Sequence, residues 1–168
     1  MEVVQKRQVY VGIADVIVSR NQVNLYTVVG SCIAVCIYDP VKHIGGMAHV
    51  MLPEMSLFKS KEPPTKFADV AVPQLIAKME SEGGIRGRMT VKLAGGANVL
   101  KTLTNGEESI GQKNFKATVK VLVKERVRIA DQDVLGDKAR TVLFNIENGF
   151  VDIKFAQVNR SSNQCAHP

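Results

Sequence analysis

Short apolar runs that end at turn residues dominate the first third of this chain, and they restrict it to a fold rich in β-strand. The runs are rich in β-branched side chains and cover residues 9–19, 25–38 and 45–52. Gly12 bends the first run, which we expect to form one or two strands, and Gly30-Ser31 divides the second run into two strands. Proline follows the second and third runs and ends them, because it cannot donate a hydrogen bond to a neighbouring strand.

Helical spacing of apolar residues is confined to two later segments. Residues 66–82 form an amphipathic pattern that stops at Gly83-Gly84. Ser109 is a suitable N-cap for a helix over residues 110–124, although the valines of that segment also permit a strand. The expected buried stripe of this second helix is Phe115, Val119, Leu122 and Val123. Its opposite face carries Lys113, Lys116, Lys120 and Lys124. These lysines form either a solvated surface or a weak binding face for an acidic helical partner.

The rest of the chain adds strands and turns. We expect four further strands, over residues 89–93, 127–130, 141–146 and 151–155. Glu147-Asn148-Gly149 is a strong hairpin signal between the last two of these strands. Gly95-Gly96 predicts a tight turn into a short helix, and Asn105-Gly106 predicts a further turn.

The order of these elements predicts one mixed α/β domain with a large share of strand. The domain covers residues 1–156, and a polar, disordered tail covers residues 157–168. Residues 54–65 form a loop that acts either as a lid or as a plain surface connection. The chain of 168 residues is long enough for one hydrophobic core and too short for two comfortable ones.

Composition narrows the cellular setting and the partners. The sequence has no apolar run long enough to span a membrane and no signal peptide, so we expect a cytoplasmic protein. Three cysteines without a regular framework argue against a secreted disulfide scaffold. A net charge of +6 favours acidic partners, and the scarcity of aromatic residues argues against binding of single-stranded nucleic acid.

Cys32 and His49 are the residues with the clearest chemical potential. A thiol beside an imidazole is the minimum for a cysteine nucleophile, because the imidazole can take the thiol proton and later protonate a leaving group. Gly30 and Ser31 precede Cys32 and allow a sharp turn that exposes the sulfur and frees backbone N–H groups for an oxyanion. Thr27 is a candidate for orienting the imidazole. The alternative for Cys32 is a buried core cysteine, which is a common fate of free cysteine.

A zinc site is the less favoured use of the same residue types. Cys32, Cys36, His43 and His49 have the right ligand chemistry. Cys32 and Cys36, however, would lie about two strand repeats apart on one continuous strand, without the usual turn between ligands. Cys36 has an unbroken apolar setting, for which a core position is sufficient.

Two segments together resemble a known family. The first runs from Thr27 through Gly30-Ser31-Cys32 to Pro40, and the second is Gly45-Gly-Met-Ala-His49-Val-Met-Leu-Pro53. They resemble the bacterial and archaeal chemoreceptor glutamine deamidase family CheD. The resemblance continues, in the order of the family, through Lys66–Asp69, Lys92–Ala97, Gly111–Asn114, Asp133–Gly136 and Arg140.

The resemblance implies a thiol amidohydrolase that converts glutaminyl side chains of methyl-accepting chemotaxis receptors to glutamates, and that can also hydrolyse receptor methyl esters. It maps the nucleophile to Cys32 and the general base to His49. The third residue of the family's catalytic set falls on Thr27, or on Tyr26 if the alignment moves by one position. Backbone amides near Gly30, Ser31 and Cys32 would stabilise the oxyanion, and no metal or organic cofactor is required.

The resemblance also implies a fold and a partner. The fold would be two stacked β-sheets flanked by helices, similar to the catalytic domain of deamidating bacterial toxins. The partner, beside the receptors, would be a CheC-type phosphatase. This chain departs from the family at Leu135 and Ala139, where glycines are usual, and at Gln112-Lys113 in place of Glu-Arg. A non-catalytic adaptor that binds receptors or the phosphatase is the alternative function, and nucleic-acid binding is a weaker one.

Overall fold

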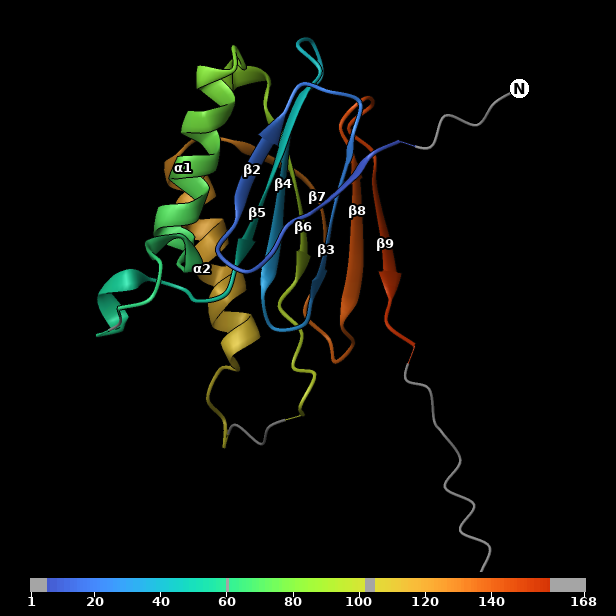
Figure 1. The fold of residues 1–168 in the computed structure, drawn as a ribbon. Coiled ribbons are helices and arrows are strands. Elements are labelled where there is room, and N and C mark those ends of the chain that lie inside the picture. The colour runs from blue at the N-terminus through green and yellow to red at the C-terminus, as the bar shows by residue number, and fades with distance from the viewer. Residues whose placement is uncertain (1–5, 60, 102–104, 158–168) are drawn as a thin grey trace, which may run out of the picture.

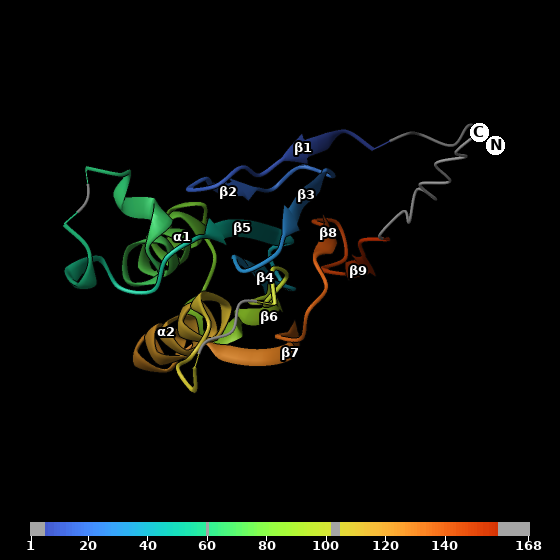
Figure 2. The same cartoon turned by 90° about the horizontal axis from the view of Figure 1, so that it is seen from below.

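Two β-sheets stack face to face, and two helices cover the outer face of one of them (Figures 1 and 2). This computed structural model describes residues 6–59, 61–101 and 105–157. The four-stranded sheet has the order β1-β3-β8-β9, and the five-stranded sheet has the order β2-β5-β4-β6-β7. The predicted arrangement of stacked sheets with flanking helices is therefore confirmed, and the similarity to deamidating toxins stays a prediction.

The strands follow the runs read from the sequence. In the four-stranded sheet they are β1 (Gln8–Tyr10), β3 (Asn24–Val29), β8 (Arg140–Asn145) and β9 (Val151–Phe155). In the five-stranded sheet they are β2 (Val16–Ser19), β4 (Ile33–Asp39), β5 (Ile44–Val50), β6 (Thr90–Gly95) and β7 (Arg128–Val134). The helices are α1 (Ala68–Ser81) and α2 (Ile110–Lys124). Three 3-10 turns cover Met55–Leu57, Pro64–Lys66 and Arg86–Arg88.

Strand β4 divides the interior into two apolar layers. Its side chains alternate, so that Ile33, Val35 and Ile37 pack with the helices, whereas Ala34, Cys36 and Tyr38 pack between the sheets. A strand that is buried on both faces reads as a continuous apolar run, which is the pattern of residues 33–38.

Glycines in β5 allow its neighbours to approach closely. A Cβ atom at Gly45 would lie 2.6 Å from Ile146 Cδ1, on the side that faces the other sheet. A Cβ atom at Gly46 would lie 2.7 Å from Leu75 Cδ1, on the side that faces α1. The glycine pair therefore has a packing role in the strand that carries His49.

Helix α2 begins where the sequence predicts, but of the expected stripe only Leu122 is fully buried. Ser109 and Gln112 form a reciprocal capping box, so the helical interpretation of residues 110–124 is confirmed. Val123 is 68% exposed and does not belong to a buried stripe, while Phe115 and Val119 are only partly buried. The buried face consists of Gly111, Asn114, Ala117, Thr118, Val121 and Leu122. Small and polar side chains occupy it because α2 starts in backbone contact with the turn after β6, where a Cβ atom at Gly111 would lie 2.3 Å from Gly96 O.

Two other expectations, a short helix after Gly96 and a departure from the family pattern at Leu135, concern the region near that turn. The short helix expected after Gly96 is wrong for the described residues 97–101 and 105–109, which form turns and irregular backbone. The reason is that Gly95 and Gly96 have φ of +116° and +68°, and the Gly96 N–H turns back to the Cys32 carbonyl at 2.8 Å. Leu135 has φ of +67°, a conformation that favours glycine, so this departure from the family pattern carries backbone strain.

Three further expectations concern the polar tail, the loop of residues 54–65 and membrane spans. The polar tail, apart from Gln157, lies outside the described residues. Residues 54–65 contain two of the 3-10 turns, and the lid interpretation stays a prediction. Within the described ranges, no helix combines the length and the apolar character that crossing a bilayer requires.

A buried carboxylate anchors the end of the five-stranded sheet that is remote from Cys32. Asp39 is fully buried and accepts hydrogen bonds from the backbone N–H groups of Val41, Lys42 and Ile85 and from the Arg88 guanidinium. Burial by itself raises the pKa of Asp39, but the hydrogen bonds from Arg88 and the three N–H groups outweigh it and lower the pKa to about 2.

We expect Asp39→Asn to lower the free energy of unfolding at neutral pH by about 1–3 kcal/mol, since the backbone donors and Arg88 lose a charged acceptor. The folded pKa of about 2 lies below the unfolded value. The stabilisation by Asp39 is therefore complete above about pH 4 and is lost as the pH falls toward 2. Urea denaturation at pH 7 and pH 3 should show the difference between the proteins shrinking on acidification. The control is Asp152→Asn, at an exposed carboxylate in a long ion pair, which should be nearly neutral. An equal loss in both variants would contradict the anchoring role.

Candidate active site

Thr27, Cys32 and His49 converge in the layer between the two sheets. Thr27 lies in β3 and His49 in β5, and both are buried. Cys32 lies in the turn of residues 30–32 that leaves the four-stranded sheet at β3 and enters the five-stranded sheet at β4. It packs against the apolar cluster between the sheets, as Ala34 does two residues later. The sequence therefore brings one residue from each of three neighbouring segments to one place.

Strand pairing places the imidazole of His49 beside two cysteines. His49 lies directly opposite Ala34 across the β4–β5 ladder. Cys32 and Cys36 flank Ala34 on the same face and so occupy the two diagonal positions, at a spacing that a histidine side chain can reach. The two cysteines differ in access, since Cys36 is 3% exposed whereas Cys32 is partly exposed.

The hydrogen bonds of Thr27 fix the proton on the His49 ring. Thr27 Oγ1 lies 2.7 Å from the Val11 carbonyl, to which it donates its only proton. Thr27 Oγ1 must therefore accept from His49 Nδ1, which lies 2.9 Å away. The Val11 carbonyl lies 3.3 Å from the same nitrogen and can only accept. Both contacts require a proton on Nδ1, so the neutral ring presents a bare Nε2 lone pair.

Tyr26 does not share this role. Its ring packs against Tyr10 with centroids 5.3 Å apart. Neighbouring residues of a strand point to opposite faces, so Tyr26 faces away from the side on which Thr27 meets His49. Of the two positions that the family pattern left open, the structure places Thr27 against the imidazole.

The free nitrogen of His49 is held in a dry environment. His49 Nε2 is buried and has no hydrogen-bond partner among the residues that the structure describes. Burial lowers the pKa of His49 below its usual range, although the Val11 carbonyl and the charge of Asp15 act in the opposite direction. The imidazole is therefore neutral at physiological pH and is available as a base.

Cys32 opens into a cavity of about 320 Å³. Apolar side chains from the segment after β6 and from the start of α2 form part of its lining, namely Val99, Leu100 and Ile110. Burial raises the pKa of the Cys32 thiol, and its own backbone N–H offsets this in part. The resting pair is thus a neutral thiol beside a neutral imidazole, and attack by sulfur requires transfer of the thiol proton to Nε2.

The remaining candidates lie away from this cavity or are engaged by neighbouring groups. All four lysines of α2 are exposed, but Lys116 pairs with Glu108 and Lys120 pairs with Glu54. Cys36 lies in the apolar layer between the sheets, where burial raises the pKa of its thiol to about 12.

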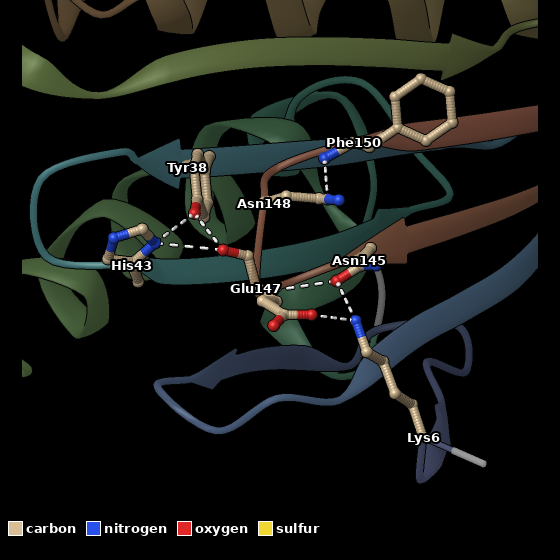
Figure 3. Close-up of polar contacts among 7 residues, drawn as sticks. All are labelled: Lys6, Tyr38, His43, Asn145, Glu147, Asn148 and Phe150. Carbon is tan, nitrogen blue, oxygen red and sulfur yellow. Dashed lines mark hydrogen bonds and ion pairs between the residues drawn. The ribbon is translucent and has the colours of Figure 1, made fainter. Parts of the chain in front are cut away.

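His43 belongs to the opposite end of β4. Its Nδ1 lies 3.1 Å from Tyr38 Oη and 3.1 Å from the Glu147 carbonyl. Figure 3 shows both contacts. Tyr38 also donates to that carbonyl, so these contacts tie the β4–β5 turn to the turn after β8. The four residues considered for zinc are thus spread along the sheet, with Cys32 and His49 near one end, Cys36 in the middle of β4 and His43 at the other end. The described ranges contain no group of three or more potential metal ligands.

Two contributors to the site were missed by the sequence analysis. The Val11 carbonyl carries no side-chain signal, because any residue could supply it. Asn114 contacts the Cys32 turn from α2, and its only signal was its presence in a segment of the family pattern.

Comparisons with known proteins agree on one family. Residues 51–155 match the family described as "CheD chemotactic sensory transduction". A protein of Clostridium novyi (strain NT) is 40% identical over 151 residues, which cover 89% of this chain and 93% of the relative. A protein of Desulforamulus reducens is 40% identical over 149 residues, which cover 88% and 90% of the two chains. A protein of Methanococcus maripaludis (strain C5) is 38% identical over 144 residues, which cover 86% and 92%. Each relative is named "Probable chemoreceptor glutamine deamidase CheD". A span of 89% of the chain necessarily includes positions 32 and 49.

The neutral thiol–imidazole pair makes a prediction about cysteine reactivity. In His49→Gln, the rate of Cys32 alkylation by iodoacetamide should keep rising between about pH 8 and pH 10, because burial raises the thiol pKa above its ordinary value near 8.5. In the parent, His49 should accelerate the reaction near neutral pH. Peptide mapping by mass spectrometry separates the cysteines, and Cys36 of the folded protein serves as the unlabelled control. A His49→Gln rate that levels off below pH 8.5 would mean that the thiol ionises without the base.

Proposed function

The chain belongs to the CheD family, and we propose that it is a chemoreceptor glutamine deamidase in which Cys32 is the nucleophile and His49 the general base. The observation that supports this most directly is the bare Nε2 of His49, buried beside the Cys32 turn while Thr27 holds the opposite ring nitrogen. This arrangement suits acyl transfer from an uncharged amide, which needs an activated nucleophile and a proton for the leaving ammonia.

The reaction runs in two halves. Nε2 of His49 takes the thiol proton while Sγ of Cys32 attacks the side-chain carbonyl carbon of a glutamine, and backbone N–H groups at Ser31 and Cys32, after the flexible Gly30, stabilise the oxyanion. The tetrahedral intermediate collapses, its C–N bond breaks, and the imidazolium returns the proton to the nitrogen, which leaves as ammonia. Water then gives a proton to His49 and adds to the thioester. Glutamate leaves, and the thiol regains its proton.

The low pKa of His49 suits both halves. A base must be unprotonated when it meets the thiol, and an imidazolium with a lowered pKa gives its proton to a poor leaving group more readily. Burial supplies both properties, since it disfavours the charged ring. Thr27 contributes by accepting from Nδ1, which leaves Nε2 free to take the thiol proton and return it to the leaving group.

The cavity suits a long neutral side chain presented by a protein surface. A glutamine can pass its carboxamide down to Cys32 while its helix rests on the apolar rim formed by Val99, Leu100 and Ile110. A glutamyl methyl ester has the same length and the same electrophilic carbon, so receptor esterase activity is part of the proposal. Attack is identical there, and methanol replaces ammonia as the leaving group.

The wider setting is part of the same proposal. The substrates are the methyl-accepting chemotaxis receptors, a CheC-type phosphatase is a partner, and the protein works in the cytoplasm. Lys113 and Lys124 are the exposed cations of α2 that remain for an acidic partner when Lys116 and Lys120 are paired within this chain. A purely adaptor role would leave the Thr27–His49 arrangement without a use.

We expect Cys32→Ala to abolish ammonia release from receptor glutamines, and His49→Gln to lower its rate by at least about 10²-fold, because the nucleophile and its base are lost. Mass analysis of receptor peptides before and after incubation measures the conversion and identifies the targets.

The matched control is Cys36→Ala, which removes a thiol from β4 that packs in the same layer between the sheets but lies outside the cavity. It should keep full activity in the folded protein. Ammonia release that persists in Cys32→Ala would refute the cysteine mechanism, and receptor binding without conversion by the parent would favour the adaptor.

We expect Thr27→Val to lower kcat by about 10–100-fold with little change in KM, because the ring loses the acceptor that sets its tautomer and direction. Steady-state kinetics on the receptor measure both constants. Val28→Thr is the control on the same strand, since residue 28 is half exposed and faces away from the site. An unchanged kcat in Thr27→Val would show that the Val11 carbonyl suffices to orient the ring.

A further inference from the structure

Asn114 joins the two segments that carry the proposed catalytic pair. It lies in the second turn of α2 and is fully buried. Its side-chain Nδ2 donates to the Ser31 carbonyl at 2.9 Å and to the Met51 carbonyl at 2.8 Å. Ser31 directly precedes Cys32, and Met51 follows His49 by two residues.

The orientation of this carboxamide is fixed by chemistry. Both partners are backbone carbonyl oxygens, which only accept hydrogen bonds. Turning the group over would set its oxygen against two other oxygens, so the amino group must face them. Asn114 is thus a double donor, a role that an aspartate or an aliphatic residue of the same size cannot fill.

The two hydrogen bonds of Asn114 lie just beyond the point where β4 and β5 stop pairing with each other. The β4–β5 ladder ends at the pair Ile33 and Val50, and the β4–β6 ladder ends at Ile33 and Gly95. Cys32 lies one residue beyond both ladders. The turn is then secured through its carbonyls, because Ala97 N–H donates to Gly30 and Gly96 N–H donates to Cys32, at 2.9 and 2.8 Å.

Helix α2 is well placed to act as the rigid support. Its N-terminus is fixed by the capping box and by the close contact of Gly111 with Gly96. The Asn114 carbonyl accepts from Thr118 Oγ1 at 2.8 Å, one turn further along. Of the three links on the Cys32 turn, only that of Asn114 also reaches the end of the histidine strand.

We propose that Asn114 is a positioning residue, which sets the separation of Cys32 Sγ and His49 Nε2 by clamping the cysteine turn to the end of β5. The proposal rests on the proposed function and adds a second support to the pair, independent of Thr27. Thr27 sets the direction of the imidazole, whereas Asn114 sets the place of the sulfur. An error of about 1 Å in such a distance can cost on the order of 10²-fold in rate.

The test substitutes Asn114→Leu, which keeps the size of the side chain, introduces no charge and removes both donors. We expect kcat on the receptor to fall by about 10²-fold with KM within about threefold, since substrate contacts are left in place. We also expect the Gly96 and Ala97 amides to exchange hydrogen at least about tenfold faster, because the turn that they bind is loosened. Asn114→Ser, which is smaller and polar, replaces Asn114→Leu if the latter does not fold.

A double-mutant cycle on Cys32 alkylation near neutral pH needs no receptor and separates positioning from general destabilisation. His49→Gln and Asn114→Leu should each slow the reaction, and the double variant should be no slower than His49→Gln alone, because both act through one proton transfer. The control is Val121→Ala, at a buried position further along α2, which should lower the melting temperature but leave kcat and alkylation unchanged.

Three results would overturn the proposal. The first is a kcat in Asn114→Leu equal to that of the parent. The second is a loss of kcat in Val121→Ala as large as that in Asn114→Leu when the two variants have the same melting temperature. The third is additivity of the His49→Gln and Asn114→Leu effects on the alkylation rate. A parent that does not deamidate the receptor would refute the proposed function instead, and the alkylation cycle would still decide the role of Asn114.

Discussion

The hydrogen bond between Thr27 and His49 is the contact on which the site depends, because it crosses from one sheet to the other. Thr27 belongs to the four-stranded sheet and His49 to the five-stranded sheet, so the imidazole is oriented only when the two sheets stack in their native register. At the opposite end of β4, Tyr38 crosses between the sheets in the same way to the Glu147 carbonyl (Figure 3). Between these polar links lies one of the two apolar layers of the interior. Packing thus brings the sheets together, and one buried and one partly buried hydrogen bond favour a single alignment of them.

That alignment gives two cysteines that pack in the same layer different surroundings. Cys36 lies inside the apolar layer, where burial raises its pKa to about 12 and leaves it chemically silent. Cys32 lies one residue before the strand begins, at the point where the chain passes between sheets and a cavity meets the layer. Burial also raises the pKa of Cys32, but a hydrogen bond from its own backbone N–H offsets part of this rise. In the proposed mechanism, the cavity gives the thiol access to substrate and the neutral imidazole of His49 accepts its proton. Position relative to the end of the ladder, rather than residue type, separates the two.

The sequence was sufficient for the elements whose signals are local. The strand breaks at Gly30-Ser31 and Asp39-Pro40, the cap at Ser109 and the hairpin at Glu147–Gly149 depend on neighbouring residues, and the structure confirms them. Long-range contacts were out of reach. The predicted buried stripe of α2 was confirmed in full only at Leu122. Contact with Gly96 turns a glycine, an asparagine and a threonine toward the sheet, and a hydrophobic stripe cannot show that preference. The choice between Thr27 and Tyr26 was likewise open until strand alternation placed Tyr26 against Tyr10.

Asn114 shows why such a site resists reading from sequence alone. A buried asparagine in a helix looks like a poor choice, since it opposes helix propensity and costs desolvation. Its carboxamide is tolerable here because two carbonyls at the open ends of β4 and β5 also lack ladder partners in the described sheet, and one donor group satisfies both. The two carbonyls and the Asn114 amino group would each destabilise the interior if left unpaired, and their pairing removes that part of the cost. The Asn114 Oδ1 atom is buried without a hydrogen-bond partner among the described residues. One side chain of α2 thereby joins the end of β5 to the turn that carries Cys32, and the proposed role of Asn114 follows from that link.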